Sequence, residues 1–180
     1  MSAEIRDYVI AAQKGDADAF GELYSIYKNE MYRYACIVVG NPDSAEDAVM
    51  DTVLEAFKNL PGLRKPESFK GWLFKILNVM CRKHYREINN ELPLTEQADM
   101  LEGDSGWMEQ VELNMELEHA LSVLSPDERQ IVMMRAVSGI GSLEISETLG
   151  ISHATVRSKY SRALAKLKIR LEERGSVVNG

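Results

Sequence analysis

The sequence predicts an all-α fold: two small helical domains joined by an acidic, flexible linker, with a helix-turn-helix in the second domain. Nearly every periodic stretch of the 180 residues has apolar residues at helical spacing, and no stretch shows the alternation of a strand. Residues 89–118 hold nine acidic residues and no Lys or Arg, as a solvated tether would. Between Ser142 and Leu171, a short apolar segment, a glycine and a long basic segment follow one another.

Composition narrows the class of protein further. Hydrophobic residues make up 45% of the chain and charged residues 27%, so a folded globular protein is expected. No apolar run is long enough to cross a bilayer, and the first 16 residues lack the pattern of a signal peptide. We therefore expect no membrane insertion and a cytoplasmic location.

The chain carries no recognisable catalytic or metal-binding pattern. Its two cysteines, Cys36 and Cys81, suggest no disulfide framework, and Cys81 with His84 is too small a cluster for a metal site. No local Ser/His/Asp or Cys/His signature and no Gly-rich phosphate loop is present. We expect no metal, no cofactor and no enzymatic activity.

The first 60 residues predict three helices. A short helix over residues 2–14 ends at Gly15, and Asp16 caps a second helix that runs to about Val39. Gly40 ends that helix, and Asn41 followed by proline begins the third.

The third helix, residues 42–60, has an apolar and an acidic side. Its spacing predicts that Val49, Val53, Leu54 and Phe57 face inward. The exposed side then carries four acidic residues, namely Glu46, Asp47, Asp51 and Glu55. Such a face is either simply solvated or a docking surface for a basic partner.

A loop over residues 60–66 leads to a fourth helix with a strongly basic edge. Between Arg64 and Arg86 there are seven Lys or Arg residues against one acidic residue. Phe74, His84 and Tyr85 are interleaved with these charges, a combination that suits single-stranded or distorted DNA. Six apolar residues are expected to face the core: Phe69, Trp72, Leu73, Ile76, Leu77 and Met80.

The second half begins after the acidic tether. A helix is expected from Trp107 to about Leu124, and Ser125 then opens a capping box followed by proline. The helix that follows should run to Ser138 and Gly139.

The helix-turn-helix comes next. Leu143, Ile145 and Leu149 lie on its short first helix, Gly150 forms the turn, and Ser152 caps the second helix. Small Ser146 is expected where the two helices cross. The second helix should turn a stripe of five residues inward: Val156, Tyr160, Leu164, Leu167 and Leu171.

Local charge favours nucleic acid as the partner of this second helix. Residues 151–174 hold seven Lys or Arg residues against two acidic ones, although the whole chain has a net charge of −7. Because the basic segments are separated from the acidic tether, the overall charge does not exclude nucleic acid. Two basic surfaces on one chain can engage two sites together.

Four stretches, in this order and spacing, resemble the extracytoplasmic-function family of bacterial RNA polymerase sigma factors. They read GDADAFGELYSIY, PDSAEDAVMDTVLEAFKNL, FKGWLFKILNVMCRKHYRE and LSPDERQIVMMRAVSGIGSLEISETLGISHATVRSKYSRALAKLK. The resemblance implies a sigma-2-like domain over residues 1–88, a linker over 89–110, a sigma-4-like domain over 111–175, and a tail over 176–180. It implies an alternative sigma factor that directs promoter-specific initiation and associates with the nucleoid when bound to polymerase.

The resemblance also implies three sets of contact residues. Core polymerase would be held by Glu46, Asp47, Met50, Asp51, Leu54 and Glu55. Single-stranded DNA of the −10 element would be bound by Lys75, Asn78, Val79, Arg82, Lys83 and Arg86. Duplex DNA of the −35 element would be bound by Ser152, His153, Thr155, Arg157, Ser158, Lys159 and Arg162.

An anti-sigma protein is a further implied partner. Five positions depart from the family pattern: Met50 replaces a usual Gln, Val79 a usual Asn, Lys83 a common Asp, Ser146 a usual Ala and Lys159 a usual Arg. Two other classes stay open from the residues themselves. One is a stand-alone helix-turn-helix regulator, which would bind duplex DNA tightly without polymerase. The other is a protein-interaction adaptor, which would show no salt-dependent DNA binding.

Overall fold

The computed structural model describes residues 2–91, 117 and 119–178, and these residues form helices and turns with no strand among them. The first domain contains α1 (Ala3–Gln13), α2 (Ala17–Val39), α3 (Pro42–Asn59), the 3₁₀ turns η1 (Leu60–Gly62) and η2 (Pro66–Ser68), and α4 (Phe69–Glu91). The second contains α6 (Pro126–Val132), the π-helical turn η3 (Met133–Val137), α7 (Ser142–Leu149) and α8 (His153–Val178). The all-α prediction is confirmed. Predictions for residues 92–116, including most of the linker, lie outside the described residues.

The helix boundaries follow local capping chemistry. Asp16 accepts a hydrogen bond from the Ala19 amide at 3.0 Å, and Asn41 accepts one from the Ser44 amide at 3.0 Å. Both are N-caps at the predicted positions. Gly150 ends α7 with a φ of +68°, a conformation that an L side chain rarely adopts.

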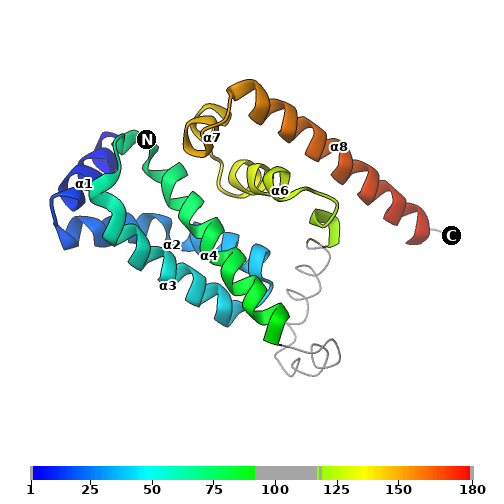
Figure 1. Ribbon diagram of the computed structural model, residues 1–180, viewed down its shortest axis with the longest axis horizontal. Coiled ribbons are helices and arrows are strands. Elements are labelled where there is room, and N and C mark those ends of the chain that lie inside the picture. The colour runs from blue at the N-terminus through cyan, green and yellow to red at the C-terminus, as the bar shows by residue number, and fades with distance from the viewer. Residues whose placement is uncertain (1, 92–116, 118, 179–180) are drawn as a thin grey trace.

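The first domain packs α2, α3 and α4 against one another, with α1 against α2. In Figure 1 these helices form one lobe, and α6, α7 and α8 form a second lobe beside α4. Large side chains from α2 and α4 fill the first core; those that are almost fully buried include Leu23, Met31, Tyr34, Phe69, Phe74 and Leu77. No described helix is both long and apolar enough to cross a membrane.

The inward face of α3 differs from the prediction. Leu54 is 52% exposed and Phe57 is 46% exposed, so the prediction that both face inward is wrong. The buried face of α3 instead carries a stripe of small residues: Ala45, Ala48, Thr52 and Ala56. Small residues allow α3 to lie close to α2 and α4, and this close approach turns the larger apolar side chains outward.

The second helix of the helix-turn-helix, α8, contacts α6 and α7. Val156 is fully buried as predicted, but Leu164 is 44% exposed and Leu171 is 58% exposed. Ala163 is fully buried in their place, because the small residue lets the helices approach closely. The predicted stripe is therefore wrong at its two outward leucines. Ser146, expected where the two helices cross, is 7% exposed.

Candidate functional site

The N-terminal turns of α8 present most of the residues predicted to bind duplex DNA. Ser152 is the N-cap, and its Oγ accepts a hydrogen bond from the Thr155 amide at 3.0 Å. The two hydroxyls also lie 2.8 Å apart, so they are engaged with each other. The remaining predicted residues that are exposed on this surface are His153, Arg157, Ser158 and Arg162.

An open cleft of about 660 Å³ lies along this surface. It is lined by Arg135, Ser142, His153, Ala154, Arg157, Ser158, Tyr160 and Ser161, and none of these residues is acidic. The Arg135 guanidinium stacks 5.4 Å from the centre of the Tyr160 ring. Sequence reasoning missed Arg135, because it is a single basic residue on a short helix and joins the α8 surface only through the fold.

Two ion pairs fix α8 against α6. Lys159, predicted to bind DNA, is bonded to Asp127 instead of being fully exposed. Lys166 contacts Glu128 at 2.7 Å, and the same carboxylate accepts the Ser125 amide at 2.9 Å, which completes the predicted capping box. The Lys166 ammonium and the Ser125 amide lower the pKa of Glu128 to about 2.

The basic edge of α4 carries the residues predicted to bind single-stranded DNA. Val79 is 56% exposed, Lys83 and Arg86 are exposed, and Arg82 is half-buried. Lys75 is exposed as well, but its ammonium donates a hydrogen bond to the Thr148 carbonyl of α7 at 3.1 Å.

Asn78 differs from these residues because its side chain is turned into the core. It is 7% exposed, and its Oδ1 accepts a hydrogen bond from the Tyr34 hydroxyl at 3.0 Å. Burial raises the pKa of Tyr34, so this hydroxyl keeps its proton and remains a donor. The structure therefore does not offer Asn78 to DNA.

Phe74 is also inside the protein. It is fully buried, and its ring packs edge-to-face on Tyr34 at 5.6 Å. The prediction that Phe74 lies among the exposed basic residues is wrong, because α4 has apolar residues on two adjoining faces and is covered by α2 and α3 on both.

The outer face of α3 combines apolar and acidic side chains. Met50 is 56% exposed, and with Leu54 and Phe57 it forms an exposed apolar row at steps of four and three residues. Glu46 and Asp47 are exposed beside this row. A groove of about 450 Å³ between α2 and α3 adjoins the row and is lined by Tyr24, Lys28, Asn29, Tyr32, Glu46, Val49, Met50 and Val53.

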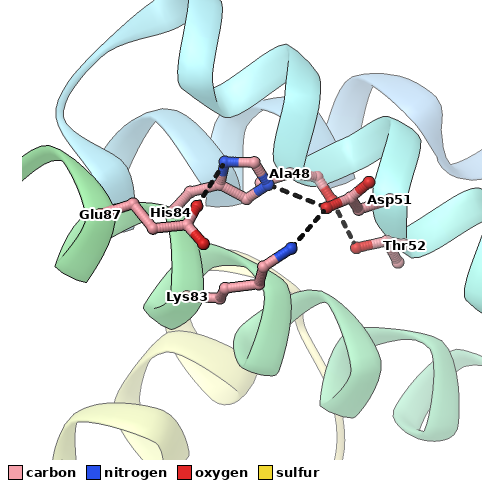
Figure 2. A network of polar contacts seen from close by, with 6 residues as sticks. All are labelled: Ala48, Asp51, Thr52, Lys83, His84 and Glu87. Atoms are coloured by element: carbon pink, nitrogen blue, oxygen red, sulfur yellow. Dashed lines mark hydrogen bonds and ion pairs between the residues drawn. The ribbon is translucent and has the colours of Figure 1, made fainter.

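Asp51 and Glu55 are engaged within the domain. Figure 2 shows Asp51 facing α4, where His84 Nε2 lies 3.0 Å and Lys83 Nζ 3.5 Å from its Oδ2. The hydrogen bond from His84, aided by Lys83, lowers the pKa of Asp51. Glu55 accepts a hydrogen bond from Asn59 at 2.7 Å. Asp51, predicted to bind polymerase, and Lys83, predicted to bind DNA, are thus paired with each other across α3 and α4.

Comparison with known proteins matches both halves of the chain to one family. Residues 23–90 match Sigma-70 region 2, and residues 114–167 match Sigma-70 region 4. The chain belongs to the extracytoplasmic-function sigma factor family. It is 28% identical to BldN of Streptomyces coelicolor over 92% of this chain and 65% of that protein. It is 24% identical to SigW of Bacillus subtilis over 96% of this chain and 100% of that protein.

A solved structure agrees with the fold of this sigma factor. CnrH, determined in complex with the cytosolic domain of CnrY, superimposes with a TM-score of 0.74 at 23% identity, over 94% of this chain and 98% of that one. Of the five positions that depart from the family pattern in this sigma factor, Met50, Val79 and Lys83 are exposed, Lys159 is half-buried and Ser146 is buried. Four of these departures therefore change the protein surface, and only the one at Ser146 lies in the interior.

Proposed function

We propose that the protein is an alternative sigma factor that docks on core RNA polymerase and directs promoter-specific transcription initiation. The observation that carries this proposal is the presence of two exposed cationic surfaces, on α4 and on α8, in two separate domains of a sigma-family chain. The proposed role is binding rather than catalysis, and it is carried out in the cytoplasm on the nucleoid. Several relatives are named as extracytoplasmic-function RNA polymerase sigma factors, which supports this proposal.

The α8 surface is proposed to read the −35 duplex. Arg157 and Arg162 are exposed on the helix that would enter the major groove. Arg135 extends this surface from the neighbouring helix, because it lines the same cleft as Arg157. The engaged hydroxyls of Ser152 and Thr155 hold the start of the helix in place, so we assign them a positioning role.

The α4 surface is proposed to hold unpaired bases and phosphates of the −10 element. Lys83 and Arg86 supply positive charge, and Val79 supplies an apolar contact for a base. Strand opening is favoured when the protein binds the unpaired strand better than the duplex. Asn78 is proposed to support Tyr34 in the core instead of contacting DNA.

The outer face of α3 is proposed to dock on polymerase. Met50 and Leu54 offer apolar surface, and Glu46 and Asp47 offer negative charge for a basic partner. Because CnrH was solved with the cytosolic domain of CnrY, we also propose a protein partner of the anti-sigma type for this chain.

Run-off transcription with core polymerase on a promoter library tests the function directly. We expect start-site selectivity from the wild-type chain. Arg157→Ala should weaken −35 binding by about 1–3 kcal/mol and relax base preference there. Arg33→Ala, at an exposed site on α2, is the matched control. An equal loss of binding for all −35 sequences would mean that Arg157 contacts only phosphate.

The docking assignment has its own test. Asp47→Lys should prevent co-purification with core polymerase, whereas Asp18→Lys, on the exposed start of α2, should not. Asp47 is preferred to Asp51 for this test, because Asp51 also holds α4 through His84. Normal co-purification of Asp47→Lys would overturn the assignment. Tight binding of duplex DNA without polymerase would instead favour a stand-alone regulator.

A further inference from the structure

The two domains contact each other where the basic helix α4 meets the acidic helix α7. The Gly71 amide donates a hydrogen bond to Glu144 Oε1 at 3.0 Å, and Lys75 Nζ donates one to the Thr148 carbonyl at 3.1 Å. A third contact joins Lys65 Nζ to Glu147 Oε1 at 3.3 Å. We call these six residues the interdomain clasp: Lys65, Gly71 and Lys75 on one side, and Glu144, Glu147 and Thr148 on the other.

Each helix of the clasp supplies a charged cap for the other. Gly71 lies in the first turn of α4, where amide groups lack an acceptor within the helix and the helix dipole is positive. The Glu144 carboxylate occupies this position. Thr148 lies in the last turn of α7, where carbonyl groups lack a donor and the dipole is negative, and the Lys75 ammonium occupies that position.

Shape as well as charge favours this contact. A Cβ atom added to Gly71 would lie 2.4 Å from Thr148 Oγ1 and 3.3 Å from the Glu144 side chain. The absence of a side chain at residue 71 therefore creates the space in which α7 is seated. Along α7, Glu144 and Glu147 are acidic and no residue is Lys or Arg, so α7 presents an acidic face to the basic side of η2 and α4.

We propose that this clasp is an intramolecular mimic of nucleic acid: α7 places carboxylates where DNA phosphates would bind, and the chain must open before the start of α4 and Lys75 can bind DNA. A helix N-terminus and a lysine are both phosphate-binding groups, and the clasp occupies both. Lys75 is at once a residue proposed to bind the −10 strand and a donor to α7. The competition with DNA rests on the proposed function, whereas the existence of the clasp does not.

Opening is tested first without DNA or polymerase, by measuring the distance between two spin labels. Cysteines are introduced at exposed Glu22 on α2 and exposed Lys168 on α8, with Cys36→Ala. Cys81 stays, because it is buried and burial raises the pKa of its thiol to about 12, so it resists labelling. The wild-type background should give one narrow distance distribution. Gly71→Leu should give a broad distribution shifted to longer distances.

Matched variants separate opening of the clasp from changes in helix propensity and from the loss of a charge. Gly21→Leu has the same change in helix propensity at an exposed site with no atom within 4 Å, and should leave the distribution narrow. Glu144→Ala opens the clasp without adding bulk, and Glu172→Ala removes an equal charge outside it. A narrow, unchanged distribution in both Gly71→Leu and Glu144→Ala would overturn the proposal.

Competition is then measured by fluorescence anisotropy with a single-stranded DNA oligonucleotide and no polymerase. Glu144→Ala should bind at least roughly threefold more tightly than Glu172→Ala, because the binding-competent open state is more populated. An opened Glu144→Ala chain that binds no more tightly than Glu172→Ala would overturn the mimicry. If run-off transcription fails while the label distances change as expected, the proposed function is wrong and the clasp stands.

Discussion

Glu128 is expected to stabilise the second domain more than an exposed acidic residue such as Glu172 does. Its side chain is 7% exposed, and its Oε2 accepts both the Ser125 amide and the Lys166 ammonium. Glu128→Ala removes half of a capping box, which costs about 1 kcal/mol. It also removes the contact with Lys166, which costs about 1 kcal/mol, since the lysine side chain is 46% exposed and solvent screens the pair. The expected loss is about 2 kcal/mol.

This loss should depend on pH. The pKa of Glu128 is about 2 in the folded protein, compared with 4.5 for an ordinary Glu carboxyl. Because the folded pKa is the lower one, the stabilisation is complete above the unfolded pKa and is lost as the pH falls from 4.5 towards 2. The difference between wild type and Glu128→Ala should therefore shrink by more than half between pH 6 and pH 3.

Urea titration followed by far-ultraviolet circular dichroism measures both effects. Glu172→Ala is the matched control, because its exposed contact with Lys168 spans one helical turn and is worth about 0.5 kcal/mol at most. A Glu128→Ala deficit below about 0.5 kcal/mol, or one that stays the same from pH 6 to pH 3, would refute the reasoning.

Three further outcomes are expected. Tyr34→Phe should lower the free energy of unfolding by about 1–2 kcal/mol in the same urea titration, because Asn78 Oδ1 loses its buried donor. Gly150→Ala should cost about 1 kcal/mol, since the φ of +68° strains an L residue, and a neutral result would contradict the role given to this turn. His84→Ala should raise the pKa of Asp51, measured by carbon NMR of the carboxyl group, and an unchanged titration would show that Lys83 alone holds it.

The helix boundaries could be predicted because their causes are local. Asn41 and Ser125 cap amides three residues away, and Gly150 adopts its conformation at a single residue, so a short stretch of sequence contains the whole interaction. The same holds for the order of the helices, and the four matching stretches indicate the family through their residues, order and spacing alone.

The buried faces of the helices and the pairs of side chains that meet in the fold could be predicted only in part. The buried stripe of α3 consists of small residues such as Ala48 and Ala56, and hydrophobic periodicity gives most weight to large ones such as Leu54. Asn78 looks like an exposed polar residue until Tyr34, 44 positions away in the chain, is placed beside it. Arg135 and Arg157 come together for the same reason, since two helices bring them to one cleft.

By itself, the sequence determined the helical class, the caps, the separation of basic from acidic segments and the family resemblance, because each depends on neighbouring residues or on their order. Tertiary structure alone decided that Asp51 pairs with His84, that Lys159 pairs with Asp127, and that α7 lies against Gly71. Those contacts join residues at least 32 positions apart. Their strength depends on distance and burial after packing, and a linear pattern of residues contains neither quantity.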